Sequence, residues 1–539
     1  MRRVAGRGAA LGRGGTVSSA EATADAGAPA SSEPRADAAA WLAVAAGTIG
    51  ALMATLDISI VNAALPVIQG EIGASGTEGT WISTAYLVAE IVMIPLTGWF
   101  VRVLTLRTFL LLMTVFFVVF SVLCGLSSSL TMMIIGRVGQ GFTGGAMIPT
   151  ALTIVSTRLP SDKQPIGIAL FGLTIVLGPI LGPLIGGYLT EHVSWHYAFF
   201  LNLPVGIGLV LLLVVGMPPA KAHLRAFFKA DWFGILGLAL FLGCLTTVLE
   251  EGQRELWFQS ELIVGLSLAS FLGLVLLIVG QRRAAEPVID LSILFERSFG
   301  SVFLMSLVTG AALYGILYLI PQFLAQIPDY NAYQSGLIVL ISGIPTLMIM
   351  PFFPFLVRTI DLRLAIAIGL FIYALSCFAD TAMTAQSDGG DFYFSQLLRG
   401  VGQGFALLFL NQAATSSVVR EKADDASGLF NAARNLGGSF GLALISTLQD
   451  RRVTFHVERI SETVNANSVQ VQERLQELGG NDPYQRLQAL KMLFGTIRQQ
   501  AVVMIYNDLF FVFGIILLVS IPLVLLLRPL PRGQGMAMH

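Results

Sequence analysis

Charged residues are scarce in this chain. Aspartate, glutamate, lysine and arginine make up 12% of its 539 residues, whereas hydrophobic residues make up 55%. Soluble domains average about 25% and about 45–50% for the same two classes. This imbalance excludes an ordinary soluble domain and predicts a membrane protein that contacts the lipid bilayer. A formal net charge of −1 gives no sign of a nucleic-acid partner.

Cysteine and histidine are also rare. Cys124, Cys244 and Cys377 each fall inside an apolar segment, and the five histidines show no metal-ligand spacing. The sequence therefore indicates neither a disulfide framework nor a metal site, and no cofactor is expected. Because no nucleophile–base pair is visible within the apolar segments, an enzyme is the least favoured class.

Long apolar segments are what the chain has in abundance. Each is about 20 residues or longer, enough to cross a hydrocarbon core of about 30 Å as a helix. We therefore expect an all-α membrane protein with fourteen spanning helices. The predicted spans are residues 41–66, 80–101, 107–127, 130–157, 165–190, 196–216, 232–250, 261–280, 299–323, 335–357, 363–384, 393–419, 426–449 and 503–527.

The basic residues predict how these spans are oriented. If the N-terminus is cytoplasmic, most arginines and lysines fall in inside segments, and the short outside loops hold only Arg254. The last outside loop, residues 450–502, carries seven more, which weakens the bias locally without reversing it. Residues 1–40, rich in Ala, Gly, Ser and Arg, are expected to form a disordered tail. From the distribution of basic residues we expect this tail and the short tail 528–539 to lie in the cytoplasm.

An internal repeat divides the spans into groups. Residues 169–182 align with residues 428–441 at an offset of 259, and residues 136–142 resemble residues 399–405 at an offset of about 262. Two agreeing offsets indicate a duplicated unit of six spans with two spans inserted, an order of six, two, six. The expected domains are an N-terminal six-helix bundle (41–216), an inserted helix pair (232–280) and a C-terminal six-helix bundle (299–527). A site between parallel halves is expected near the membrane midplane.

Ionisable residues inside the predicted spans require a reason, since each costs about 2.5–3.5 kcal/mol on insertion scales. We expect Asp57, Glu90 and Arg137 to meet in a central cavity of the first half. Burial disfavours a charged carboxyl and a nearby arginine favours it, so a cavity that alternates between two faces can load and release a proton. The alternative for Arg137 is a structural clamp on backbone carbonyls.

Polar residues of both halves are predicted to line a substrate cavity; they are Asn62, Gln140, Arg399, Gln403, Asn431 and Arg434. By contrast, Asp380, Glu250 and Glu251 lie near the ends of predicted spans. There we expect solvated or snorkelling side chains.

A glycine–proline pattern marks the fifth span. Gly178, Gly182 and Gly186 recur every fourth residue, so they line one face of a helix and let another helix approach closely. Pro179 and Pro183 remove backbone donors and bend the same helix. With Gly172 and Gly187 at its ends, the stretch predicts a conformational joint, and static tight packing is the alternative.

The chain resembles the drug:proton antiporter family of fourteen-spanners, the EmrB/QacA type of the major facilitator superfamily, over nearly all of residues 41–530. Residues 56–66 resemble the family's first-helix signature, residues 137–141 its fourth-helix motif, and residues 172–187 its fifth-helix antiporter motif. Residues 195–206 carry a further landmark of the family.

The resemblance implies a major facilitator fold with two pseudo-symmetric bundles in the bacterial inner membrane. It implies export of drugs or other toxic amphipathic compounds by alternating access, driven by the proton gradient without a cofactor. It also implies functional roles for Asp57 and Asn62, proton transfer at Arg137, and a swing between conformations governed by the fifth-helix motif. Glu90 is an embedded acid of the kind found in the second span of such exporters.

The cytoplasmic loop after the second span departs from the superfamily pattern. It lacks the acid and the second glycine common there, so the usual charge latch is not expected. Arg102 and Arg107 remain and are predicted to interact with the cytoplasmic helix ends.

Three alternatives stay open at this point. The periplasmic loop 450–502 resembles the EmrB loop, which implies a periplasmic adaptor and an outer-membrane channel as partners; a solvated helical hairpin is the other interpretation. The same fold could export or import one metabolite such as a siderophore, an amino acid or an organic acid. A membrane sensor or scaffold without transport is a rival from another class.

Overall fold

The computed structural model describes residues 37–160, 162–222, 227, 230–284, 287–419, 422–464, 468–479 and 483–527. Within these ranges the chain forms helices joined by short turns and contains no strand. The helices of the first half are α1 (Ala38–Ile72), α2 (Gly76–Gly79), α3 (Trp81–Leu104), α4 (Leu106–Gly125), α5 (Leu130–Arg158), α6 (Gln164–His192), α7 (His196–Phe200) and α8 (Asn202–Gly216).

Two long helices follow and lead into the second half. The middle segment consists of α10 (Trp232–Glu251), η1 (Trp257–Gln259), α11 (Glu261–Arg283) and η2 (Leu291–Phe295). The second half consists of α12 (Arg297–Gln326), α13 (Ala332–Ile349), η3 (Met350–Phe352), α14 (Phe353–Thr359), α15 (Leu362–Ala379), η4 (Asp380–Ala382), η5 (Gly389–Asp391), α16 (Phe392–Ser416), α17 (Ala423–Thr463), α18 (Val469–Gly479), α19 (Pro483–Ser520) and η7 (Ile521–Leu526).

Helix ends follow local chemistry. α1 begins where the Asp37 carboxylate accepts a hydrogen bond from the Ala40 amide at 2.8 Å, and it ends at Gly73, whose φ of 73° suits a residue without Cβ. Only Thr105 separates α3 from α4. The predicted tails 1–40 and 528–539 lie outside the described residues, except that α1 already begins at Ala38. Strong helix formers after a capping aspartate account for that difference.

Eleven helical segments in the described ranges are long and apolar enough to cross a membrane. The helices α5, α16 and α17 are also long but are not among these segments, because glycine, threonine, glutamine and arginine lower their hydropathy. One arginine in each of these helices is buried within the protein: Arg137 in α5, Arg399 in α16 and Arg434 in α17.

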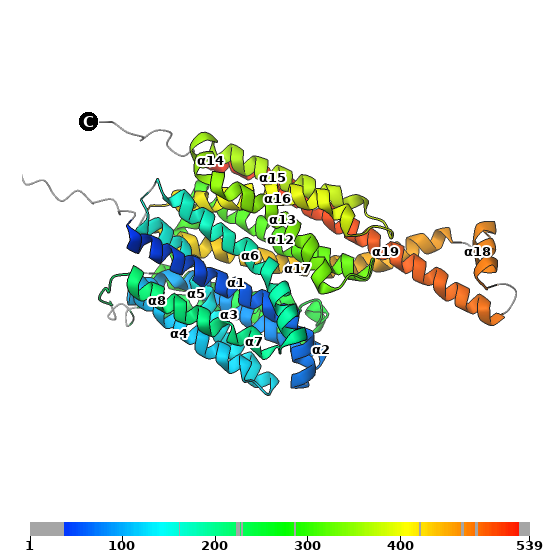
Figure 1. The fold of residues 1–539 in the computed structure, drawn as a ribbon, viewed down its shortest axis with the longest axis horizontal. Coiled ribbons are helices and arrows are strands. Elements are labelled where there is room, and N and C mark those ends of the chain that lie inside the picture. Colours follow the sequence, from blue (N-terminus) through cyan, green and yellow to red (C-terminus); the bar gives the residue numbers. More distant parts are fainter. Residues whose placement is uncertain are drawn as a thin grey trace, which may run out of the picture. The chain divides into compact units, whose positions relative to one another are not determined.

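The same pairing of helices recurs in the two halves. In the first half α1 packs against α6 and α8, and α5 packs against α3 and α4; in the second half α12 packs against α17 and α19, and α16 packs against α13 and α15. α10 and α11 pack against each other, and α10 also contacts α3 and α17. Figure 1 shows the first half in blue to cyan-green and the second in green to red.

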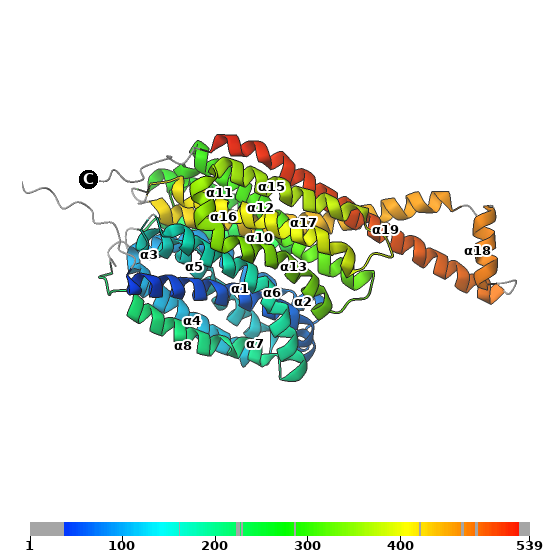
Figure 2. The same cartoon turned by 45° about the horizontal axis from the view of Figure 1, so that its top comes forward.

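The predicted loop 450–502 is largely helical, as the helical spacing of its apolar residues indicates. α17 continues to Thr463, α19 begins at Pro483, and α18 lies between them. No proline interrupts residues 450–482, and their apolar residues recur at helical spacing, so the helices continue beyond the other spans. Figures 1 and 2 show these helices projecting from one end of the bundle. We call this the α18 end and the opposite end, where α1 begins, the termini end.

Candidate functional site

A buried charge pair joins α1 to α5. Arg137 Nη1 donates to Asp57 Oδ2 at 2.6 Å, and both side chains are 0% exposed. Gln140 and Asn202 donate to Asp57 Oδ1 at 3.0 and 2.7 Å. Arg137 Nε donates to the Ile82 carbonyl at 3.2 Å, so the guanidinium also clamps α3. Three donors thus face the two carboxylate oxygens, which offsets part of the cost of burying the charge.

Asn202 is the member of this cluster that sequence reasoning did not select. It lies at the start of α8 and also donates to Ser121 at 2.9 Å. The sequence does contain a feature that could have identified it, because Asn202 is the one amide side chain in the apolar run 196–216. A polar residue of this kind inside a span marks an internal contact.

Glu90 lies apart from this pair, at the seam between α3 and α17. Its side chain is 2% exposed. Its hydrogen-bond partner is the Asn435 side chain of α17, and the guanidinium groups of Arg434 and then Arg137 act on its charge. Tyr314 of α12 donates to Asn435 at 3.4 Å. The structure thus brings Asp57 and Arg137 together and places Glu90 against the other half.

The second half carries its own buried charge pair. Arg399 Nη2 donates to Asp380 Oδ2 at 2.5 Å. Asp380 is 0% exposed, so the expectation of a solvated carboxylate was wrong. Its partner Arg399 lies on the neighbouring helix α16, 19 residues further along the chain. Glu251 is likewise buried, at 2% exposed, and accepts from Thr84 at 2.8 Å. Partially buried Glu250 accepts from Ser439 at 2.7 Å.

A cavity of about 640 Å³ lies between the halves. It is bounded by α1 and α6 on one side and by α12 and α13 on the other. Its lining is mostly apolar and includes Asn62, Pro179 and Pro183. Because it borders the last turns of α12 and the first turns of α13, it lies toward the α18 end. Sequence reasoning did not select its tyrosines, Tyr318 and Tyr330.

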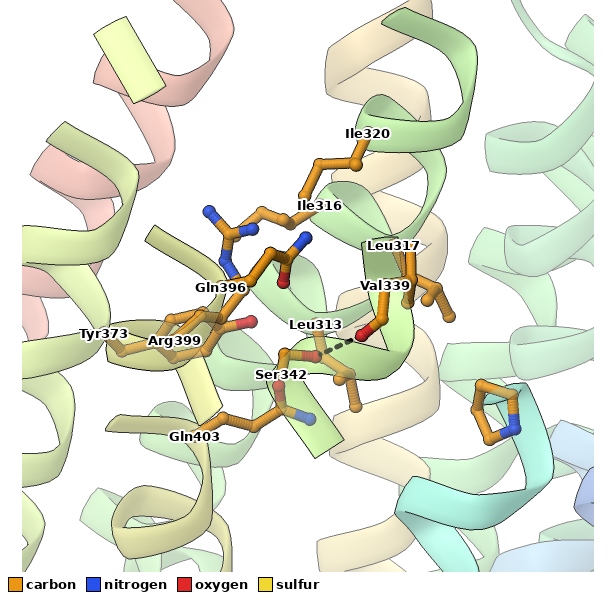
Figure 3. Close-up of a pocket in the computed structure, with 11 residues that line it drawn as sticks. Leu313, Ile316, Leu317, Ile320, Val339, Ser342, Tyr373, Gln396, Arg399 and Gln403 are labelled. Atoms are coloured by element: carbon orange, nitrogen blue, oxygen red, sulfur yellow. Dashed lines mark hydrogen bonds between the residues drawn. The ribbon is translucent and has the colours of Figure 1, made fainter. Parts of the chain in front are cut away.

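A small adjoining cavity of about 40 Å³ shares Pro179, Leu317 and Val339 with the large one. Figure 3 shows Gln396, Arg399 and Gln403 of α16 around it. A third cavity, of about 450 Å³ and apolar throughout its lining, lies between α6 and the α13–η3–α14 segment.

The predicted substrate-cavity residues are therefore divided. Asn62 lines the large cavity, and Arg399 and Gln403 line the small one. The other three do not line these cavities. Gln140 is tied to Asp57, Asn431 donates to the Ser427 carbonyl at 2.9 Å, and Arg434 faces Glu90.

The glycine stripe of α6 faces α1. A Cβ at Gly182 would lie 2.1 Å from the Ser59 Cβ, and one at Gly178 would lie 2.5 Å from Thr55 Oγ1. A Cβ at Gly186 would lie 2.8 Å from the Ile60 carbonyl oxygen. Gly172 instead faces Leu408 of the second half, and Gly187 has no neighbour within 4 Å of such an atom. α6 therefore contacts its own half through the stripe and the other half at Gly172.

The halves are joined at the termini end. Arg102 Nη1 donates to Asp425 Oδ1 at 2.9 Å, and its Nη2 donates to the Val288 carbonyl at 2.7 Å. Asp425 Oδ2 also accepts from the Asp290 amide at 3.1 Å. We call this arrangement the termini-end latch. Arg107 is half-buried on α4 and forms no ion pair with any residue that the structure describes.

Lys422 extends the latch through Asp290. Their ion pair measures 2.6 Å. Burial opposes ionisation of Asp290, but hydrogen bonds from Lys422 and Ser292, with the Lys422 charge, outweigh burial and lower the pKa of the Asp290 carboxyl below its ordinary value.

Comparison with known proteins identifies the family to which this architecture belongs. The family model described as Major Facilitator Superfamily matches residues 47–442. The chain is 33% identical to the colistin resistance protein EmrB of Acinetobacter baumannii over 89% of this chain and 95% of that protein. It is 30% identical to the multidrug export protein EmrB of Escherichia coli K12 over 90% and 95%.

Among solved structures, the human organic anion transporter MFSD10 has a TM-score of 0.57 and 14% identity, over 89% of this chain and 99% of that one. At that identity the likeness concerns the fold alone. The chain therefore belongs to the Major Facilitator Superfamily and, within it, to the family of the EmrB proteins.

Proposed function

We propose that this protein is a proton-driven exporter of drugs and other toxic amphipathic compounds across the bacterial cytoplasmic membrane, working by alternating access. Relatives named for multidrug export and colistin resistance support export of toxic compounds. The observation that carries the proposal is a 640 Å³ apolar cavity at one end of the seam between two halves that are latched at the other end.

We infer an architecture of fourteen spans in the order six, two, six. The N-terminal bundle is 41–216, the inserted pair is 232–280, and the C-terminal bundle is 299–527. The recurring helix pairs of the two halves support this division. With both termini in the cytoplasm, the α18 end faces the periplasm, and the structure is then the outward-open state.

Proton coupling is assigned to Asp57, Glu90 and Arg137. The partners of Glu90, Arg434 and Asn435, belong to the other half. When α3 and α17 move apart, Glu90 loses these partners, so its affinity for a proton differs between the two states. Asp57 and Arg137 stay within one half and move as a unit.

The fifth-helix motif acts at the moving surface. Its glycine stripe holds α6 against α1, while Pro179 and Pro183 line the cavity. A helix without two backbone donors bends at these positions at little cost. Substrate is held between this helix and α12 before its release at the α18 end, where tyrosines and a few amides offer adaptable contacts.

The projecting helices α17, α18 and α19 are proposed to dock a periplasmic adaptor protein, which would lead to an outer-membrane channel. Large apolar side chains are exposed there, including Val469, Tyr484 and Leu487. If the segment is instead a solvated hairpin, its removal will leave export unchanged.

The test is substrate-driven proton flux in everted membrane vesicles, run with lipophilic drugs and with a siderophore, an amino acid and an organic acid. We expect drug-dependent proton movement that Glu90→Gln abolishes at normal protein abundance. Glu191→Gln, an exposed acid at the end of α6, is the matched control and should behave as the parent. Flux with only one metabolite indicates the specific transporter, and an intact resistance phenotype in Glu90→Gln indicates a sensor or scaffold.

A further inference from the structure

The last turn of α10 and the residues after it present two polar stripes to opposite halves of the protein. Glu250 accepts from Ser439 of α17 at 2.7 Å, and Gln253 donates to Asp450 of the same helix. Glu251 accepts from Thr84 of α3 at 2.8 Å. Within each stripe the residues are three apart: the first lies in the last turn of α10 and the second in the turn that follows it.

Arg254 completes the second stripe. It pairs with Glu251 at 2.9 Å and donates to Thr80, just before α3 begins. This is the single basic residue of the short predicted outside loops. Two adjacent carboxylates thus bind different halves, Glu250 the second and Glu251 the first. We call residues 250, 251, 253 and 254 the brace.

At the brace, α3 and α17 are linked to each other through α10 rather than through direct close contact. Toward the termini end these helices approach closely, since a Cβ at Gly428 would lie 3.1 Å from the Ile94 carbonyl oxygen. At the α18 end, α10 contacts both helices, and the brace links Thr84 to Ser439. Figure 2 labels the three helices concerned.

We propose that the brace is a positioning device for alternating access, in which Glu250 and Glu251 stabilise the state whose cavity opens at the α18 end. This inference rests on the proposed function, because it requires two states. Closure at the α18 end brings the ends of α3 and α17 together. The last turn of α10 then cannot keep both stripes bonded. Each bond that must break favours the state seen here.

The experiment follows two reporter cysteines in purified full-length protein in lipid nanodiscs, where a maleimide reaches both ends. Ala325→Cys lies in the large cavity at the α18 end and is exposed. Ser427→Cys lies at the termini end, where the serine is buried and donates to the Pro149 carbonyl of the other half. The parent with its three native cysteines gives the background.

We expect Glu250→Ala and Glu251→Ala to slow labelling at position 325 and to speed it at position 427. The ratio of the rate at 427 to the rate at 325 should rise about tenfold, the size expected for a lost hydrogen bond to a charged group. Glu250→Gln keeps an oxygen acceptor for Ser439 and should restore most of the parent rates. Ser439→Ala should resemble Glu250→Ala, and the two together should not add. Glu261→Gln, exposed at the start of α11, is the matched control.

Opposite shifts at the two reporters distinguish a brace from a loss of stability, which would speed labelling at both. Unchanged labelling at both reporters, or faster labelling at both, overturns the proposal. The assay uses no substrate and no proton gradient, so a failure of proton-coupled transport leaves its outcome interpretable.

Discussion

At the residue scale, each half of the protein buries one carboxylate–guanidinium pair, Asp57–Arg137 in the first half and Asp380–Arg399 in the second. Asp57 and Arg137 were selected because charges inside apolar spans need a reason, and their pairing is local to one half. Asp380 was assigned to solvent because its partner Arg399 follows in another helix. A side chain's position along one helix does not show which neighbour faces it, so Asp380 could not be placed from the sequence.

Substitutions in the buried Asp57–Arg137 pair distinguish a structural role of these residues from a role in proton coupling. Arg137→Ala leaves the Asp57 carboxylate buried without its guanidinium, and we expect unfolding to become easier by about 3–5 kcal/mol. The double variant Asp57→Leu/Arg137→Met removes both charges and should recover much of that stability. If Asp57 and Arg137 carry proton coupling, this stable double variant still lacks proton-driven export.

Thermal unfolding in detergent and vesicle transport measure the two effects. A double variant that both folds and exports with the parent's proton dependence would leave Arg137 as a structural clamp only.

The Asp290–Lys422 pair predicts a pH dependence at the termini end. Because the native pKa of Asp290 lies below its ordinary value of 3.8, the pair contributes its full stability above that value. The contribution is lost as the pH falls through the lowered native pKa. We expect Asp290→Asn to lower the midpoint of thermal unfolding modestly at pH 6, and this difference from the parent to shrink as the pH falls below 3.8. A difference that persists or grows in acid contradicts this assignment.

At the element scale, hydropathy and periodicity located the helices well and their ends less well. Each predicted span coincides with a described helix or helix pair, but α17 and α19 run beyond the predicted boundaries into residues 450–502. Hydropathy reports where lipid ends, whereas a helix continues until a proline, glycine or cap stops it. The sequence also could not predict that the glycine stripe packs against α1. The spacing of the glycines shows that they share one face of α6, but it does not show which helix covers that face.

The glycine stripe gives a matched pair of substitutions on one helix. Gly182→Ala places a methyl group 2.1 Å from the Ser59 Cβ, so α6 must move away from α1. Overpacking of this kind costs about 1–3 kcal/mol, and we expect export to fall strongly. Gly187→Ala meets no atom within 4 Å and should export normally. Drug resistance of cells with equal protein abundance is the measurement. Equal resistance in both variants would show that close contact between α6 and α1 is dispensable.

At the scale of the whole molecule, the repeat predicted two related halves, and the structure adds an asymmetry between their contacts. The halves are latched at the termini end, while the large cavity lies toward the α18 end. Sequence offsets describe what the halves share. They carry no information on which end of the seam is open, because that depends on a small free-energy difference between two packings of the same chain.

The termini-end latch is expected to control how readily a reagent reaches the termini end. The Arg102 side chain is 43% exposed, and an exposed ion pair alone contributes about 0–1 kcal/mol. Arg102 also donates to the Val288 carbonyl and so joins three segments. We therefore expect Arg102→Ala to raise maleimide labelling at Ser427→Cys severalfold. The swap Arg102→Asp/Asp425→Arg should restore part of the parent rate, because the charge pair is rebuilt but the carbonyl contact is not. Labelling that Arg102→Ala leaves unchanged would show that apolar packing between α5 and α17, rather than the latch, keeps the termini end closed.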